Sequence, residues 1–121
     1  MGELNCLFEK YDRLFLFDTE TTGLQYNRDE IIEFAAVVLE RKDGKVIVTE
    51  EYDELITLSP GGFVPAQIEA LTGISNQDIR ERGIPKTRVC CDIAPSGFQL
   101  WGKGENSVFP FQRKTWLEVS R

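Results

Sequence analysis

Two apolar runs near the start of the chain most constrain what it can fold into. Residues 14–17 read Leu-Phe-Leu-Phe, and residues 31–39 are apolar throughout except for Glu33. Short runs of aromatic and aliphatic side chains are typical of strands that are buried on both faces of a sheet. The sequence therefore predicts a sheet that contains these two segments as buried strands.

A tight turn follows the second run. Asp43-Gly44 is the two-residue signature of a type I′ hairpin, because both positions of that turn need a positive φ. We expect a third strand to begin near Lys45 and to continue toward Leu58. The first half of the chain thus predicts three consecutive strands, with the second and third joined as a hairpin.

The hydrophobic period changes after the loop Ser59-Pro60-Gly61-Gly62. Three helices are expected, over residues 65–73, 76–82 and 86–94. Their signals are Pro65 in a first turn, Ile68 and Leu71 on one face, Gly73 as a C-cap, Ser75 with Asp78 as a capping box, Gly83 as a stop, and an apolar stripe of Val89, Cys90 and Ile93. The pattern predicts an α/β fold.

The amino-acid composition excludes several kinds of catalytic and metal site. The 121 residues carry a net charge of −6 and no histidine, which excludes Ser-His-Asp triads, Cys-His pairs and histidine-ligated zinc. The net negative charge of the chain repels the phosphates of nucleic acid, which disfavours a simple basic nucleic-acid-binding module. An enzyme that binds nucleic acid through metal ions stays possible, because bound cations reverse the local charge. The odd set Cys6, Cys90 and Cys91, without a CxxC motif, favours a reducing, cytoplasmic location. No run reaches transmembrane length, so no membrane association is predicted.

The strongest break in the sequence lies near residues 94/95. Residues 1–94 hold ten basic and eighteen acidic groups, whereas residues 95–121 hold four and two. The second segment is rich in glycine, proline and aromatic residues and has no sustained period. Its aromatic side chains could pack internally, stack on single-stranded nucleic acid or support self-association; they include Trp101, Phe109, Phe111 and Trp116.

Asp18 and Glu20 follow the first buried run and are the most informative polar residues. Alternate residues of a strand point to the same side, so the two carboxylates share one side at the end of that strand. Paired carboxylates suit Mg²⁺, and two such ions form the usual clamp for phosphodiester hydrolysis. An Asp-x-Glu spacing alone is more often a solvated acidic strand end than a metal site. The choice between the two therefore depends on the surrounding residues.

The surrounding residues resemble a known family. Residues 17–24, FDTETTGL, resemble the first motif of the DnaQ-like, DEDD-type 3′→5′ exonucleases, the proofreading family. Residues 31–40 are similar to the family's second strand, and residues 64–76 resemble its helix and its LTGI turn. Order and spacing agree across residues 12–94, in a style that looks like the proofreading domains of bacterial DNA polymerase III, including the PolC type. The resemblance implies a ribonuclease-H-like fold: a mixed sheet with three N-terminal strands, then helices.

The same resemblance implies a site. Asp18 and Glu20 match the two catalytic metal ligands of the first motif, and the implied cofactor is Mg²⁺ or Mn²⁺. Thr21 and Thr22 match positions that line the 3′-terminal nucleotide, and Thr72 lies where the family approaches the terminal base. The competing interpretation is that Thr21 and Thr22 only form a turn and that Thr72 only ends a helix. The implied substrate is the 3′ end of single-stranded DNA.

The chain departs from the family after residue 94. The later motifs should supply two more aspartates and, in the commonest subfamily, a histidine; the acids after Ala94 are Glu105 and Glu118, and no tyrosine follows to act as a base instead. Asp92 is a weak candidate for a third acid.

We therefore expect residues 1–94 to be the N-terminal part of a truncated, inactive exonuclease domain that binds metal weakly. Residues 95–121 would be an atypical tail, and a shifted reading frame would explain it. The alternative is a non-catalytic remnant or binding module that forms a homodimer through an exposed sheet and the aromatic tail.

Overall fold

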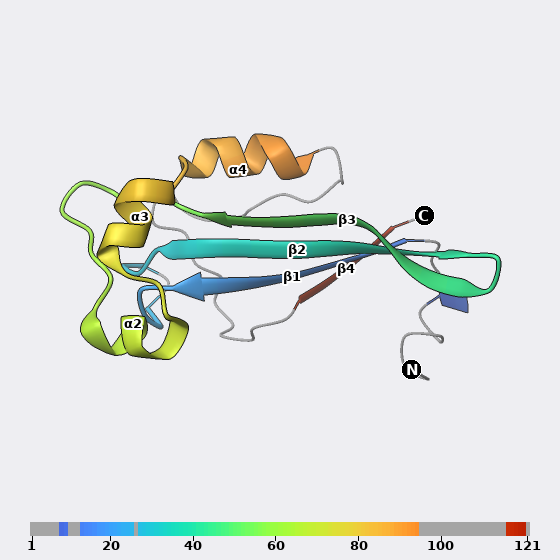
Figure 1. Cartoon of the computed structure of the whole chain (residues 1–121), viewed down its shortest axis with the longest axis horizontal. Helices are drawn as coiled ribbons and strands as arrows, with labels where there is room; N and C mark the ends of the chain where they lie inside the picture. Colours follow the sequence, from blue (N-terminus) through green and yellow to red (C-terminus); the bar gives the residue numbers. More distant parts are fainter. Residues whose placement is uncertain (1–7, 10–12, 26, 95–115, 121) are drawn as a thin grey trace.

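The computed structural model describes residues 8–9, 13–25, 27–94 and 116–120 (Figure 1). Strands and helices follow one another in the predicted order, with a further strand near the end of the chain. The elements are β1 (Arg13–Thr21), β2 (Ile31–Lys42), β3 (Lys45–Leu55), α2 (Ala66–Thr72), α3 (Asn76–Arg82), α4 (Lys86–Ile93) and β4 (Trp116–Ser120).

The strands form one sheet in the order β3-β2-β1-β4, so β1 and β2 are its inner strands. All three described strand pairings are antiparallel. The parallel component of the predicted mixed sheet is limited, in this part of the chain, to an isolated bridge between Ile56 and Ile84. Because β4 pairs with β1, a stretch beyond the predicted 94/95 break belongs to the same sheet, while residues 95–115, including Trp101, Phe109 and Phe111, lie outside the described residues.

The three predicted strands are confirmed, with two corrections at their ends. β1 continues past Asp18 to Thr21, because residues 18–21 still pair with β2. β3 ends at Leu55 rather than near Leu58. The predicted hairpin is present: Asp43 and Gly44 have φ angles of 51° and 76°, as a type I′ turn requires.

The three predicted helices are confirmed as well. The Ser75 side chain accepts from the Asp78 backbone N–H, and the Asp78 side chain accepts from the Ser75 backbone, which is a complete capping box for α3. Gly73 ends α2 in the left-handed conformation, with a φ of 76°. The predicted apolar face of α2 is only partly buried, since Ile68 is half-buried whereas the Leu71 side chain is 81% exposed.

The two faces of the sheet differ in what covers them. On one face, which we call the α4 face, Val89 and Ile93 of α4 pack against the sheet. The sheet contributes Phe15, Phe17, Phe34, Ala36 and Val38 to that core. The rings of Phe17 and Phe34 stack with centroids 5.4 Å apart. This packing orients β1 and β2 and leaves their alternate residues on the opposite face.

That opposite face is called the Asp18 face below. Residues paired across neighbouring strands share a face, so the register defines its members. They are Leu14, Leu16, Asp18 and Glu20 of β1, Glu33, Ala35, Val37 and Leu39 of β2, and Val48, Glu51, Asp53 and Leu55 of β3.

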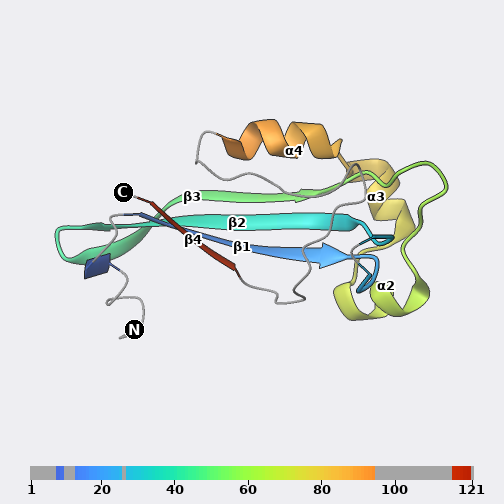
Figure 2. The same cartoon turned by 180° about the vertical axis from the view of Figure 1, so that it is seen from behind.

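The short helices α2 and α3 lie at the end of the sheet where β1 ends and β2 begins, and both views agree on this placement (Figures 1 and 2). A second core cluster supports them, formed by Ile32, Leu55, Val64, Ile74 and Ile79. No helix in the described part of the chain is long and apolar enough to cross a membrane.

Candidate active site

β1 presents Asp18 and Glu20 on the Asp18 face, as the sequence predicts. Asp18 pairs with Ala35 and Glu20 pairs with Glu33 across the β1–β2 ladder. Both side chains are half-buried, and the Oδ1 atom of Asp18 is buried. The buried Phe17 on the other face fixes the strand at this point, so both carboxylates project from a rigid backbone.

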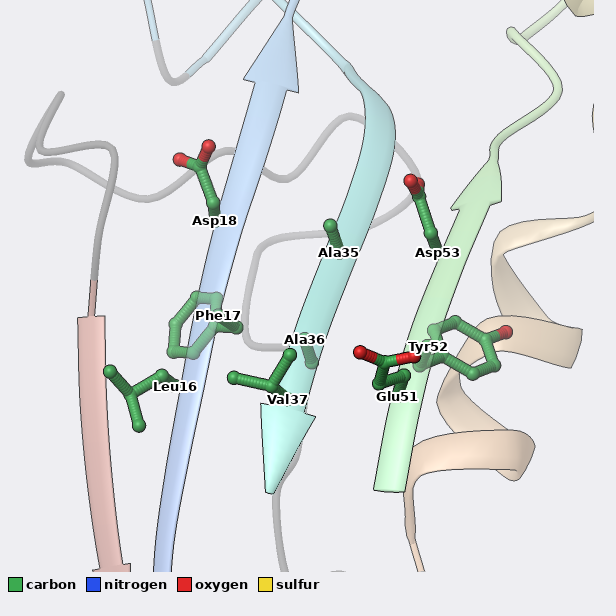
Figure 3. Close-up of a pocket in the computed structure, with 9 residues that line it drawn as sticks. All are labelled: Leu16, Phe17, Asp18, Ala35, Ala36, Val37, Glu51, Tyr52 and Asp53. Carbon is green, nitrogen blue, oxygen red and sulfur yellow. The ribbon is translucent and has the colours of Figure 1, made fainter. Parts of the chain in front are cut away.

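Two further acids stand beside this pair. Asp53 of β3 lies opposite Ala35, so Asp18, Ala35 and Asp53 form one row across three strands (Figure 3). Glu33 belongs to the next row. Burial, a hydrogen bond with Asp53 and the negative charges of Asp53, Glu20 and Asp18 together raise the pKa of Glu33 to about 7. The structure thus concentrates negative charge around the predicted metal ligands.

The raised pKa of Glu33 predicts a pH-dependent stability. Between about pH 4.5 and about 7, the folded chain keeps a proton on Glu33 that the unfolded chain has released, so stability falls as the pH rises through this window. In Glu33→Gln, the amide donates to Asp53 without becoming charged. After allowance for solvent screening, we expect this variant to be more stable than the parent by about 1–2 kcal/mol at about pH 8.

Urea unfolding at two pH values measures this effect. At about pH 4.5 the variant and the parent should unfold at nearly the same urea concentration, because both carry a neutral group at position 33. Glu69→Gln is the matched control, since it removes an exposed carboxylate of α2. If Glu33→Gln gained the same stability at both pH values, or if the Glu69→Gln control gained as much, the raised pKa would not belong to Glu33.

The donor chemistry fits a hard divalent cation, but the ligand set is small. Asp18 and Glu20 supply carboxylate oxygens at one strand end, which Mg²⁺ and Mn²⁺ prefer. Among the described residues, no three His, Cys, Asp or Glu side chains gather as a metal site. Asp92 adds nothing here, because it lies on α4 and accepts a hydrogen bond from Tyr52 at 2.9 Å, on the other face of the sheet.

The three predicted threonines use their hydroxyl groups inside the chain. Thr21 Oγ1 donates to the Gly23 carbonyl at 2.7 Å. Thr72 Oγ1 donates to the Ile68 carbonyl at 2.8 Å and accepts from the Ile74 N–H at 3.1 Å, which helps to end α2. Thr22 is 8% exposed and shapes the loop after β1. In this state the hydroxyls stabilise local turns.

Asp29 organises that loop, and sequence reasoning missed it. The buried carboxylate accepts from the Thr22 hydroxyl at 3.0 Å and from the Gln25 N–H at 2.8 Å. Thr22 Oγ1 in turn accepts from the Glu30 N–H at 3.0 Å. A Cβ atom at Gly23 would collide with the Asp29 carboxylate, so any larger residue there must displace that carboxylate. The available signal was an aspartate two residues before the second apolar run, which begins at Ile31.

A groove adjoins this loop. It has a volume of about 910 Å³, and its lining includes Thr22 and Gly23 with the side chains of Leu24, Phe63 and Leu71. These three large apolar side chains are 74%, 64% and 81% exposed. Large apolar side chains exposed around one hollow are typical of a binding site.

The family comparison agrees with this geometry. The family model RNase_T, described as Exonuclease, matches residues 15–90. The chain belongs to this exonuclease family. The match begins inside β1, and it includes both carboxylates, the loop and the helices α2 and α3.

Two curated relatives resemble the N-terminal half of this chain. The 3′-5′ exonuclease DinG of Bacillus subtilis (strain 168) is 44% identical over 66 residues, which are 54% of this chain and 6% of DinG. The DNA polymerase III subunit epsilon of Aquifex aeolicus (strain VF5) is 41% identical over 61 residues, which are 50% of this chain and 27% of that subunit. The chain therefore spans less than a third of either relative.

Solved structures confirm the fold. E. coli exonuclease I in complex with a dT13 oligonucleotide superposes with a TM-score of 0.57 at 24% identity, over 69% of this chain and 18% of that one. A full-length 3′-exonuclease superposes with a TM-score of 0.58 at 18% identity, over 78% of this chain and 36% of that one. The ribonuclease-H-like fold class predicted from the sequence is thus confirmed.

Proposed function

We propose that this chain carries the metal-binding strand of a 3′→5′ exonuclease that hydrolyses terminal phosphodiesters of DNA. The observation that carries the proposal is the placement of Asp18 and Glu20 on one face of an inner strand, within the segment that matches the exonuclease family. The curated relatives, an exonuclease and a subunit of DNA polymerase III, favour DNA as the substrate class and proofreading as the role.

In this proposal Asp18 and Glu20 hold Mg²⁺ or Mn²⁺. When bound, such ions stabilise the negative charge that develops on the attacked phosphate. The protein's own part is to fix both carboxylates on a paired strand and to keep Asp18 Oδ1 away from bulk water. The neighbouring Asp53 adds negative charge, and Glu33 does so once it ionises above about pH 7, which favours a cation at this position.

The loop after β1 would position the terminal nucleotide. Thr22 and Asp29 hold the backbone at Gly23, where the absence of a side chain makes room for the Asp29 carboxylate that organises the loop. Leu24, Phe63 and Leu71 offer apolar surface on which a base can stack. Thr21 and Thr72 act in this arrangement mainly by shaping the turns that frame the groove.

The isolated chain should be a poor catalyst. Two carboxylates bind Mg²⁺ weakly on their own, and the residues that resemble the family supply no histidine as a general base. We therefore expect negligible turnover by the chain alone, with full activity only when a polypeptide supplies the remaining groups.

A hybrid protein tests the function. Residues 15–90 replace the matching part of the Aquifex aeolicus epsilon subunit, and a 5′-labelled single strand of DNA is the substrate. The hybrid should shorten the strand stepwise from its 3′ end with Mg²⁺ or Mn²⁺ and should stop when EDTA is added. A folded hybrid that leaves the DNA intact, or that cleaves in the presence of EDTA, would contradict the proposal.

A further inference from the structure

Two loops line the groove beside the candidate site, and both leave the sheet at the end where α2 and α3 lie (Figure 1). The loop between β1 and β2 carries Leu24, and the loop between β3 and α2 carries Phe63. Both apolar side chains are largely exposed at the groove. Side chains this exposed gain little from packing, so their positions depend on how the backbone of each loop is held.

Two adjacent acids, Asp29 and Glu30, hold these two loops. The buried Asp29 carboxylate accepts hydrogen bonds from the residues on either side of Leu24, as described above. The half-buried Glu30 carboxylate reaches the other loop, where its Oε1 atom accepts from the Ser59 N–H at 2.9 Å and from the Ser59 hydroxyl at 2.7 Å. One short stretch of chain thus contacts both loops that line the groove.

The segment that Glu30 contacts is a rigid turn over residues 59–62. The Gly62 N–H donates to the carbonyl at position 59 at 2.8 Å, and Gly61 has a φ of 80°, as the third position of a type II turn requires. A Cβ atom at Gly62 would lie 2.8 Å from Glu30 Oε2, so the carboxylate packs directly against the turn. Glu30 therefore holds the whole turn, which ends one residue before Phe63.

A second contact holds the chain directly after Phe63. The Val64 N–H donates to Asn76 Oδ1 at 2.7 Å, and Asn76 Nδ2 donates to the Val64 carbonyl at 3.1 Å. Asn76 is the first residue of α3. The backbone at Phe63 is thus held by α3 on one side and by Glu30 on the other, and the loss of the Glu30 side chain would release one side alone.

We propose that Glu30 is a positioning residue that holds Phe63 in place relative to Leu24, so that the groove accepts the terminal base of a DNA strand. This inference rests on the proposed function. The Thr22 N–H donates to the Glu30 carbonyl at 2.9 Å, a backbone bond that a change of the Glu30 side chain leaves intact. The hydrogen bonds of that side chain to Ser59 do not involve the carboxylates of β1, so its loss should affect binding of the strand rather than the chemical step.

Amide hydrogen exchange of the full chain tests this contact without DNA or metal. In Glu30→Ala, the N–H groups of Ser59 and Gly62 should exchange faster by on the order of tenfold, because the turn loses the acceptor that holds it. The Val64 N–H should keep its rate, since its acceptor is Asn76. Glu30→Gln retains an Oε1 acceptor and should exchange like the parent.

Steady-state kinetics of the hybrid exonuclease separate a positioning role from a purely structural one. With a 5′-labelled single strand, we expect Glu30→Ala to raise the KM by on the order of tenfold and to leave kcat within about twofold of the parent. Glu30→Gln should keep the parent KM, although it lacks the same charge. Glu69→Ala removes an exposed carboxylate of α2 and is the matched control, which should change neither constant.

Unchanged exchange at Ser59 in Glu30→Ala would overturn the proposal, and so would an unchanged KM in an active hybrid. Equal changes of KM in Glu30→Ala and Glu30→Gln would also overturn it, because Glu30 would then act through its charge alone. An inactive parent hybrid would contradict the proposed function instead, and the exchange rates would still decide whether Glu30 holds the loop.

Discussion

Asp18→Asn should lower the metal-dependent activity of the hybrid exonuclease by at least about a hundredfold. A bound divalent ion contributes several kcal/mol of transition-state stabilisation, and each 1.36 kcal/mol corresponds to about tenfold in rate. The asparagine keeps the size of Asp18 and its place opposite Ala35 but removes the negative charge. The change therefore tests the charge rather than the packing of the strand.

Initial rates of 3′-end shortening, measured against Mn²⁺ concentration, give the size of this effect. Glu69→Gln in the same hybrid is the control, since it removes one exposed carboxylate of α2 and should leave the rate unchanged. If Asp18→Asn were as active as the parent hybrid, the assignment of Asp18 as a metal ligand would be wrong, whatever the substrate.

Asp29→Ala should destabilise the chain by about 2–4 kcal/mol. The substitution removes the acceptor for the buried Thr22 hydroxyl, which costs about 1–3 kcal/mol, and the acceptor for the partly buried Gln25 N–H, which adds about 1 kcal/mol. The carboxylate is 7% exposed, so water replaces these bonds poorly. A loss of this size is a large fraction of the total stability expected for a small domain.

Urea unfolding followed by circular dichroism measures this loss. Asp29→Asn serves as the graded comparison, because its side-chain carbonyl can still accept from Thr22 while its amide cannot accept from Gln25. The free energy of unfolding of Asp29→Asn should fall between the values of the parent and of Asp29→Ala. A change below about 0.5 kcal/mol in Asp29→Ala would show that the network does not stabilise the loop.

Local signals in the sequence were sufficient for most of the fold. The Asp43-Gly44 turn and the Ser75 capping box each specify backbone geometry by their own chemistry, and both are present. The alternation of side chains likewise placed Asp18 and Glu20 on one face, because a strand permits no other arrangement. β1 continues to Thr21, past the apolar residues that indicated it, because pairing with β2 extends the strand beyond them.

The rest depended on contacts between distant residues. The acidic residues 50, 51, 53 and 54 follow one another closely in the sequence, but the alternation along β3 divides them between the two faces of the sheet. Only the register with β2 shows that Asp53 stands beside Glu33 and thereby raises its pKa. In the same way, nothing in the sequence reveals that Asp29 folds back onto the Thr22 hydroxyl, whose contact with a nucleotide stays a prediction of the resemblance.

The close contact between Gly23 and the Asp29 carboxylate means that these two positions cannot vary independently. A side chain at position 23 is tolerated only if position 29 becomes smaller, and a smaller residue at position 29 gives up the bonds that hold the loop. Their substitution effects should be strongly non-additive. A mutational path that changes either residue must first pass through a less stable intermediate, which makes this loop slow to diverge.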